Sequence, residues 1–229
     1  MAYGGCMATA IVTGASRGLG RALAAALDEG GYRVVVDARD GPALETAWAG
    51  SDILRLAGDV GDERHLRALV AAAGEIDVLV NNAGLLGPSP LPSLATYPLD
   101  AIRQLFEVNV FAPLRLMQLA LPQLGTGARL LNVTSDAGSE AYAGWGGYGA
   151  SKAALEHLTS VFAVEHPEFA VYCVDPGDMR TVMHQNAFPG EDISDRPLPE
   201  DVVPHLVSLI DSGLPSGRYR AAQLGLSHA

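Results

Sequence analysis

A tyrosine and a lysine four residues apart are the side chains of this sequence best suited to chemistry. Tyr148 and Lys152 lie in the run GYGASKAA. A phenol loses its proton only at about pH 10, so it is a poor acid or base at neutral pH. Residues four apart share one face of a helix, so the ammonium of Lys152 can stabilise the phenolate of Tyr148 and lower its pKa. The spacing predicts a proton donor and acceptor, although an isolated pair of this kind is more often a surface tyrosine beside a surface lysine.

A glycine-rich turn near the N-terminus is the second candidate site. An apolar segment over 9–12 runs into the turn TGASRGLG at 13–20 and then into an alanine- and leucine-rich helix. Free N–H groups and the dipole at a helix start bind phosphate, and glycine lets the backbone approach it closely. The spacing is G-x-x-x-G-x-G rather than G-x-G-x-x-G, and such a turn can also serve packing alone. We expect a pyrophosphate site formed by Gly14, Ser16, Arg17, Gly18, Leu19 and Gly20.

With these two elements the chain resembles the short-chain dehydrogenase/reductase family, in its short single-domain form, over about residues 9–221. Five further segments match family motifs and follow one another in the family's order. They are Asp59-Val60, Asn81-Asn82-Ala83-Gly84, Asn109 within Val108-Asn109-Val110, Ser135 thirteen residues before Tyr148, and Pro176-Gly177 with Thr181. Each segment is common by chance, but the ordered set is highly specific.

The resemblance implies an oxidoreductase that interconverts a small-molecule carbonyl and an alcohol by hydride transfer to or from a nicotinamide. It implies that Tyr148 gives or takes the hydroxyl proton, and that Lys152 both lowers the pKa of this tyrosine and holds the nicotinamide ribose. Ser135 would polarise the carbonyl, and Asn109 would hold a water that links Lys152 to solvent. The alternatives are that Ser135 caps the turn after a strand and that Asn109 bonds helix backbone. Cofactor contacts are implied for Asp59, Val60, Asn81, Ala83, Gly84, Tyr148, Lys152, Pro176, Gly177 and Thr181.

The end of the expected strand 33–38 bears on the choice between NAD and NADP. An acidic residue there usually binds the adenosine ribose hydroxyls and selects NAD, which Asp37 would fit. In the family this acid falls one residue later, where the chain has Ala38, and Arg39 matches the arginine of members that prefer NADP. Arg17 matches a second basic residue of that class, and two guanidinium groups can clamp a phosphate. We expect NADP(H); the alternative is NAD(H), with Asp37 on the ribose and Arg39 exposed in a loop.

Alternating strand and helix patterns predict an α/β fold: one domain over 1–229, with a doubly wound Rossmann-type parallel sheet of about seven strands and helices on both faces. Near-continuous apolar runs such as 34–36 are typical of parallel strands buried on both faces. Such sheets bind ligands at the carboxyl ends of their strands. Strands are expected near 8–13, 33–38, 53–58, 76–81, 128–134, 170–175 and 218–222, and helices near 18–29, 42–49, 62–73, 98–123, 147–165 and 199–211. The irregular stretch 182–198 is implied to cover the substrate.

Composition limits the partners of the protein. Its formal net charge is −11 with scattered basic residues, so we expect no nucleic-acid partner. Cys6 and Cys173 are far apart and offer neither a disulfide framework nor metal-ligand spacing, so no metal is expected. No signal segment or membrane-length apolar run is present, which predicts a cytoplasmic protein with no membrane partner. Met7 precedes the first strand and is an alternative start to Met1. The resemblance implies a homodimer or homotetramer built on helices 98–123 and 147–165.

Residues beside the main motifs carry weaker hypotheses. His184 could face substrate, but an exposed loop histidine is favoured. Asp136 is interpreted as a turn residue, and Tyr142 and Trp145 either line the substrate pocket or pack beneath a loop. The acidic run 191–195 is interpreted as a solvated loop.

Two other classes of function compete with a simple oxidoreductase. A non-catalytic dinucleotide-binding redox sensor would be expected to lose catalytic residues, yet Asn109, Ser135, Tyr148 and Lys152 are all present. A nucleotide-sugar epimerase or dehydratase would need a larger region after residue 181.

Overall fold

One parallel sheet forms the centre of the protein. The computed structural model describes residues 7–225. Its seven strands are ordered β3-β2-β1-β4-β5-β6-β7, and every neighbouring pair is parallel, which confirms the predicted doubly wound sheet. The strands are β1 (Thr9–Val12), β2 (Arg33–Ala38), β3 (Leu54–Ala57), β4 (Ile76–Asn81), β5 (Leu124–Val133), β6 (Ala170–Asp175) and β7 (Gly217–Arg220).

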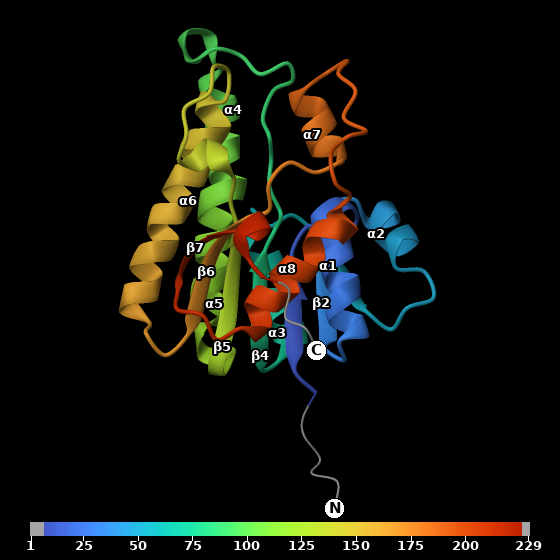
Figure 1. Ribbon diagram of the computed structural model, residues 1–229. Helices are drawn as coiled ribbons and strands as arrows, with labels where there is room; N and C mark the ends of the chain where they lie inside the picture. Colours follow the sequence, from blue (N-terminus) through green and yellow to red (C-terminus); the bar gives the residue numbers. More distant parts are fainter. Residues whose placement is uncertain (1–6, 226–229) are drawn as a thin grey trace, which may run out of the picture.

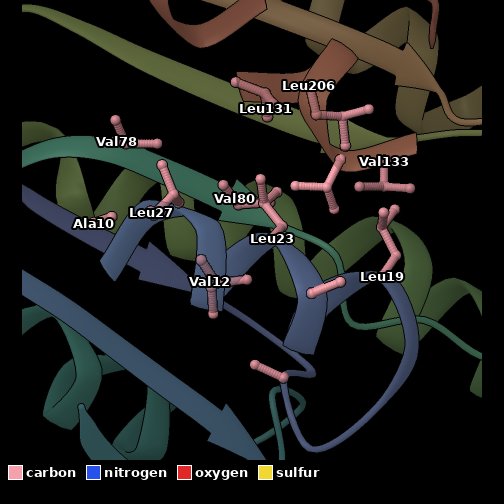
Figure 2. Packing of buried hydrophobic residues seen from close by; sticks show 14 of the residues in the cluster. Ala10, Val12, Leu19, Leu23, Leu27, Val78, Val80, Leu131, Val133 and Leu206 are labelled. Atoms are coloured by element: carbon pink, nitrogen blue, oxygen red, sulfur yellow. The ribbon is translucent and has the colours of Figure 1, made fainter. Parts of the chain in front are cut away.

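Helices cover both faces of the sheet (Figure 1). They are α1 (Gly18–Glu29), α2 (Gly41–Ala47), α3 (Glu63–Ala73), α4 (Leu99–Phe106), α5 (Ala112–Ala120), α6 (Gly146–Glu165), α7 (Val182–Ala187) and α8 (Pro199–Asp211). Successive side chains of a strand point to opposite faces, so each strand supplies two cores. Val12 packs with Leu23 and Leu206 on the side of α1 and α8 (Figure 2). Ile11 lies in the opposite core, which includes residues of α3, α5 and α6.

Burial on both faces explains why the central strands are almost purely apolar. Val12, Leu23 and Leu206 each have no exposed surface. Removing a side chain of this size from water stabilises a fold by about 1.5–3 kcal/mol. The two cores therefore fix the sheet rigidly, and the loops at its carboxyl edge carry the polar residues.

The structure departs from the predicted elements in two places. The expected helix 98–123 is divided into α4, a π-helical segment Glu107–Phe111, and α5. The stretch 182–198, predicted to be irregular, begins with the short helix α7, whose first turn is capped because Thr181 Oγ1 accepts the N–H of His184 at 3.2 Å. Across residues 7–225, no helix has both the length and the apolar character needed to cross a membrane.

The strand order reverses at the centre of the sheet, and this places a crevice there. Strands β1 and β4 are neighbours, although β2 and β3 lie between them in sequence. Open α/β sheets bind ligands outside the carboxyl ends of their strands at such a reversal. The glycine-rich turn follows β1 and Asn82 follows β4. In Figure 1, α7 and the segment that leads into α4 lie beyond this edge of the sheet.

Candidate active site

The glycine-rich turn forms the first wall of the site. Gly14 has a φ of 69°, and a Cβ on it would lie 2.9 Å from the Cα of Ala83, so only glycine fits there. Gly18 has a φ of 58°, and a Cβ on it would meet only a methyl group of Thr181, at 3.7 Å. Helix α1 starts without a side-chain cap. Its first N–H groups and the open surface at Gly18 therefore suit the pyrophosphate of a dinucleotide.

Two residues that the motif analysis did not single out as ligands hold this turn in place. The hydroxyl of Thr13 accepts the N–H groups of Asn82 and Ala83, each at 3.0 Å. The amide Nδ2 of Asn82 donates to the carbonyl of Thr13 at 2.8 Å. The turn after β1 is thus tied to the segment after β4. Their place in the two quoted motifs was a usable signal.

Asp37 is a structural residue of the turn. Its carboxylate is 1% exposed. Oδ1 accepts the N–H of Gly14 at 2.7 Å, and Oδ2 accepts Nε2–H of His65 at 2.9 Å. Both oxygens are therefore engaged within the protein, which argues against the alternative that this carboxylate binds ribose hydroxyls. Nothing near residue 37 in the sequence indicates His65 as its partner.

Arg17 and Arg39 line the large cleft of the molecule. Both side chains are exposed. Neither guanidinium has a hydrogen-bond or ion-pair partner in the part of the chain that the structure describes. Two unpaired guanidinium groups beside the turn form a site suited to a phosphate group.

The cleft has a volume of about 1330 Å³ and extends from these arginines to the Tyr148 and Lys152 pair. This fits a dinucleotide, because the two pairs of lining residues are chemically distinct and the glycine turn also lines the cleft. Among the sequence-predicted residues, its lining contains Gly14, Ser16, Arg17, Gly18, Leu19, Arg39, Val60, Ala83, Gly84, Tyr148, Lys152 and Thr181. The other sequence-predicted residues lie outside this lining: Gly20, Asp59, Asn81, Asn109, Ser135, Pro176 and Gly177.

Several residues outside the lining have clear roles in holding its walls. The Nδ2 of Asn81 donates to Oδ1 of Asn132 at 2.7 Å inside the core. The carboxylate of Asp59 accepts the N–H of Gly61 at 2.8 Å. Gly177 donates its N–H to Oδ1 of Asp175 at 2.9 Å, which fixes the turn after β6. These contacts shape loops around the cleft.

Tyr148 and Lys152 lie on α6 and are almost fully buried, at 8% and 4% exposure. Burial raises the pKa of Tyr148, the carboxylates of Asp175 and Asp136 raise it further, and a hydrogen bond with Ser135 lowers it. Burial lowers the pKa of Lys152 to about 8. Nζ donates to the carbonyl of Val133 at 2.8 Å and lies 5.5 Å from the centre of the tyrosine ring.

This geometry corrects one detail of the sequence prediction. Nζ of Lys152 was expected beneath the phenol hydroxyl, where it would lower the pKa of Tyr148. Within the protein its hydrogen bond goes to a backbone carbonyl instead, and the net direction of the Tyr148 pKa is upward. The cause is desolvation, which disfavours the phenolate more than Ser135 stabilises it.

Ser135 follows β5 and serves a local structural purpose as well. Its Oγ accepts the N–H of Ala137 at 3.3 Å, as the N-cap of a short 3₁₀ helix, and donates to Oδ1 of Asp136 at 3.0 Å. The same residue also lowers the pKa of Tyr148. Ser135 therefore both caps the turn after β5 and influences Tyr148.

Asn109 is fully buried in the π-helical segment between α4 and α5. Oδ1 accepts the N–H of Leu85 at 2.8 Å, and Nδ2 donates to the carbonyl of Leu85 at 2.9 Å and to Oγ of Ser151 at 3.0 Å. The side chain thus joins the loop after β4 to α6. A Cβ on Gly84 would lie 3.4 Å from Oδ1 of Asn109 and 3.8 Å from Nζ of Lys152, so both groups border this glycine.

His184 was predicted to be an exposed loop histidine, and this is wrong. It lies on α7 and is buried, with its ring 4.8 Å from that of Phe188. Nδ1 lies 3.7 Å from a carboxylate oxygen of Asp178. Burial follows from the helix, because α7 turns this side chain inward.

The aromatic residues before Tyr148 differ in their surroundings. Trp145 packs edge-to-face on Tyr148, with ring centres 5.8 Å apart, and also contacts Phe188 at 5.9 Å. Tyr142 is 43% exposed, and its hydroxyl donates to Asp136 and Glu140. Trp145 therefore packs beside the tyrosine, whereas Tyr142 is neither buried nor part of the cleft lining. Cys173 is buried, and Cys6 lies outside the described residues.

Comparisons with known proteins agree with this fold. The family model of short chain dehydrogenases matches residues 8–192. An uncharacterized oxidoreductase of Saccharomyces cerevisiae is 33% identical over 186 residues, which are 77% of this chain and 72% of the relative. L-fucose dehydrogenase of Mus musculus is 34% identical over 181 residues, 75% of this chain and 65% of that protein.

A solved structure of a short chain dehydrogenase has the same fold. A short chain dehydrogenase of Shigella flexneri, in complex with NADP, has a TM-score of 0.87 at 28% identity, covering 94% of this chain and 97% of that one. The chain belongs to the short-chain dehydrogenase/reductase family, whose members are NAD(P)-dependent oxidoreductases.

Proposed function

We propose that this protein is an NADP(H)-dependent oxidoreductase that interconverts a small-molecule carbonyl and an alcohol. The observation that carries the proposal is a cleft lined both by Arg17 and Arg39 and by Tyr148 and Lys152. A phosphate-binding end and a proton-transfer end within one cleft match the two ends of a nicotinamide dinucleotide phosphate. The complex of the Shigella flexneri relative with NADP supports the same cofactor.

The residues of this chain would hold the cofactor in three parts. Arg17 and Arg39 would bind the 2′-phosphate, and the N–H groups at the start of α1 with Ser16 and Gly18 would bind the pyrophosphate. Val60 would contact the adenine, and Lys152 with Thr181 would contact the nicotinamide half. The bound cofactor supplies or accepts the hydride.

Tyr148 moves the proton in this proposal. In reduction its hydroxyl donates a proton to the carbonyl oxygen, and in oxidation the phenolate takes it back. Ser135 donates a hydrogen bond to the same oxygen and orients it. Lys152 is held by the carbonyl of Val133 with Nζ 5.5 Å from the centre of the Tyr148 ring, and its positive charge would stabilise the phenolate during the reaction.

We further propose that the chain forms a homodimer or homotetramer through α4, α5 and α6. Two exposed apolar residues lie on α6: Val161 at 40% and Val164 at 82% exposure. Phe111, at the end of the π-helical segment before α5, is 52% exposed. Apolar side chains at this exposure are suited to a subunit contact. Light scattering coupled to size-exclusion chromatography tests this assembly.

The test of the proposed function is a turnover screen of ketones, aldehydes and quinones, each with NADPH and NADH. We expect reduction of at least one carbonyl class with NADPH and a lower catalytic efficiency with NADH. Binding of NADPH by fluorescence titration, without turnover across the panel, would favour the redox-sensor alternative. An efficiency that is higher with NADH would contradict the assignment of Arg17 and Arg39.

A further inference from the structure

Arg218 connects the edge of the sheet to the segment that carries Ser135. It lies on β7, paired with Cys173 of β6, and its side chain is 28% exposed. One terminal nitrogen donates to the backbone carbonyl of Ser135 at 3.2 Å and to Oγ of Ser139 at 3.4 Å. Its Nε donates to Oε1 of Glu156 at 2.9 Å. One guanidinium therefore contacts both ends of the turn that follows β5, and also α6.

Glu156 is the second member of this arrangement. It lies on α6, one helical turn after Lys152, and its side chain is 16% exposed. The same Oε1 accepts the hydroxyl of Thr134 at 2.7 Å. A Cβ on Gly138 would lie 3.0 Å from this oxygen, so the turn after Ser135 packs directly on the carboxylate. Arg218 and Glu156 thus hold the backbone on both sides of Ser135.

Asp175 places a negative charge next to Arg218 and Arg220. Its side chain is 7% exposed, and its Oδ2 lies 3.5 Å from Arg218 and 3.8 Å from Arg220. After burial, its carboxylate is the largest influence that raises the pKa of Tyr148. Burial raises the pKa of Asp175 itself, whereas the N–H of Gly177 and the two arginines lower it. Several titratable groups surround Tyr148 and Asp175. They are Asp136, Glu140, Lys152, Glu156, Cys173, Arg218 and Arg220.

We propose that Arg218 is a positioning residue for catalysis, which fixes the backbone of Ser135 against α6 and neutralises the carboxylates of Asp175 and Glu156 behind Tyr148. The inference rests on the proposed roles of Ser135 and Tyr148. Arg218 touches neither substrate nor cofactor in this assignment and acts only through the serine backbone and the local charge. A guanidinium suits this position because its fork reaches a carbonyl and a carboxylate at once.

Arg218→Ala is the direct test, with 9,10-phenanthrenequinone and NADPH as the assay pair. We expect kcat to fall about 10- to 100-fold, since small displacements at a reacting centre have effects of this size. The KM for NADPH should stay within about twofold, because Arg218 is not among the residues that line the cleft. The alkaline limb of the pH profile of kcat should move to higher pH by about 0.5–1 unit, because unbalanced carboxylates disfavour the phenolate and keep the phenol protonated. Arg218→Lys should retain part of kcat, and added guanidinium should restore part of the activity of Arg218→Ala.

Arg220→Ala is the matched control. Arg220 lies on the same strand, pairs with Glu140 at 2.8 Å and approaches Asp175, but within residues 7–225 it makes no hydrogen bond or ion pair with Ser135 or Glu156. Its kcat should change by less than about threefold. Amide hydrogen exchange over residues 134–139 adds a readout that needs no substrate, and exchange should rise in Arg218→Ala and not in Arg220→Ala.

The outcomes separate this inference from the proposed function. If Tyr148→Phe is inactive while Arg218→Ala keeps wild-type kcat, pH profile and exchange, the positioning role is wrong and the proposed function stands. If Tyr148→Phe remains active, the proposed function itself fails, and exchange at 134–139 still decides whether Arg218 holds the turn. Equal losses of kcat in Arg218→Ala and Arg220→Ala would also overturn the inference.

Discussion

Nε2 of His65 on α3 lies 2.9 Å from Oδ2 of Asp37 at the end of β2, while Oδ1 of Asp37 holds the N–H of Gly14 at 2.7 Å. A residue of the helix under the sheet thereby fixes the glycine turn through a buried carboxylate. Both carboxylate oxygens of the acid at the end of β2 are therefore engaged within the protein. The consequences for cofactor binding can be measured.

Asp37→Ala should weaken NADPH and NADH by similar factors. Loss of a charge-assisted bond to Gly14 loosens a turn that both cofactors share, and we expect about a tenfold increase in each Kd. Fluorescence titration of both cofactors measures this. A loss restricted to NADH would show that Asp37 binds the ribose after all. His65→Ala, which leaves Oδ2 without its donor, should lower the free energy of unfolding by about 1–3 kcal/mol in urea titrations.

The pair of arginines should control the choice of cofactor. Arg39→Ile removes a cation from the phosphate end of the cleft, and we expect the Kd of NADPH to rise at least about tenfold with little change for NADH. Adding Ala38→Asp should bring the ratio of catalytic efficiencies toward NADH. A double variant that keeps its preference for NADPH would indicate that the phosphate is bound elsewhere.

Tyr148→Phe should reduce turnover by at least about a hundredfold, because it removes the proton donor and retains the ring that packs on Trp145. The Kd of NADPH should remain near the wild-type value. Steady-state kinetics and fluorescence titration test the two parts separately. Near-normal turnover would move the proton transfer to another group.

Ser135→Ala should lower kcat, and Ser135→Thr should retain part of it because a hydroxyl remains. Since Oγ also caps the following turn, thermal unfolding of both variants has to accompany the kinetics. Unchanged kinetics in Ser135→Ala on several substrates would leave the serine with its capping role alone.

Lys152 should make stability depend on pH in a specific direction. Its pKa is about 8 in the folded protein, below the value of 10.5 for an ordinary lysine. The unfolded chain therefore binds more protons between these values, so this lysine's contribution to stability rises with pH across the window and is least favourable below pH 8. Relative to wild type, Lys152→Met should be most stable near pH 7 and lose up to about 3 kcal/mol of that relative stability by pH 11. Urea unfolding at several pH values measures it. A difference that is constant with pH would contradict the depressed pKa.

The same variant tests the dual role of Lys152 in catalysis. Removing the ammonium takes away both the charge beside Tyr148 and the proposed ribose contact, so kcat should fall and the KM of NADPH should rise. If the KM of NADPH is unchanged, the ribose contact is wrong.

Much of this fold is predictable because the sheet is buried on both faces. The apolar runs of β2 and β4 predict their strands with the observed bounds. The α6 range is also predicted to within one residue. The interruption of the helix over 98–123 is not, because the π-helical segment has the same hydrophobic periodicity as the α-helices that flank it. Its anchor, the bond of Asn109 to Leu85, depends on a loop brought close only in the folded chain.

Contacts at long sequence separation account for what the site prediction missed. Asp37 could be placed at the end of a strand from its neighbours, but its partner His65 follows 28 residues later, on another helix. Arg218 lies 83 residues after Ser135, and no spacing rule connects them. The N-cap of α7 was missed as well: Thr181 was predicted only as a cofactor contact, and the stretch that follows it was expected to be irregular.

Strand β7 is synthesised after all the segments that carry the proposed catalytic residues. Asn109, Ser135, Tyr148 and Lys152 all leave the ribosome before Arg218, which belongs to the last strand. A nascent chain that has already paired β1 to β6 lacks the guanidinium that bonds the Ser135 carbonyl. If Arg218 positions Ser135 as proposed, a chain stalled or cut before residue 218 would carry the proposed catalytic side chains without the guanidinium that bonds the Ser135 carbonyl, and its turnover should be slower.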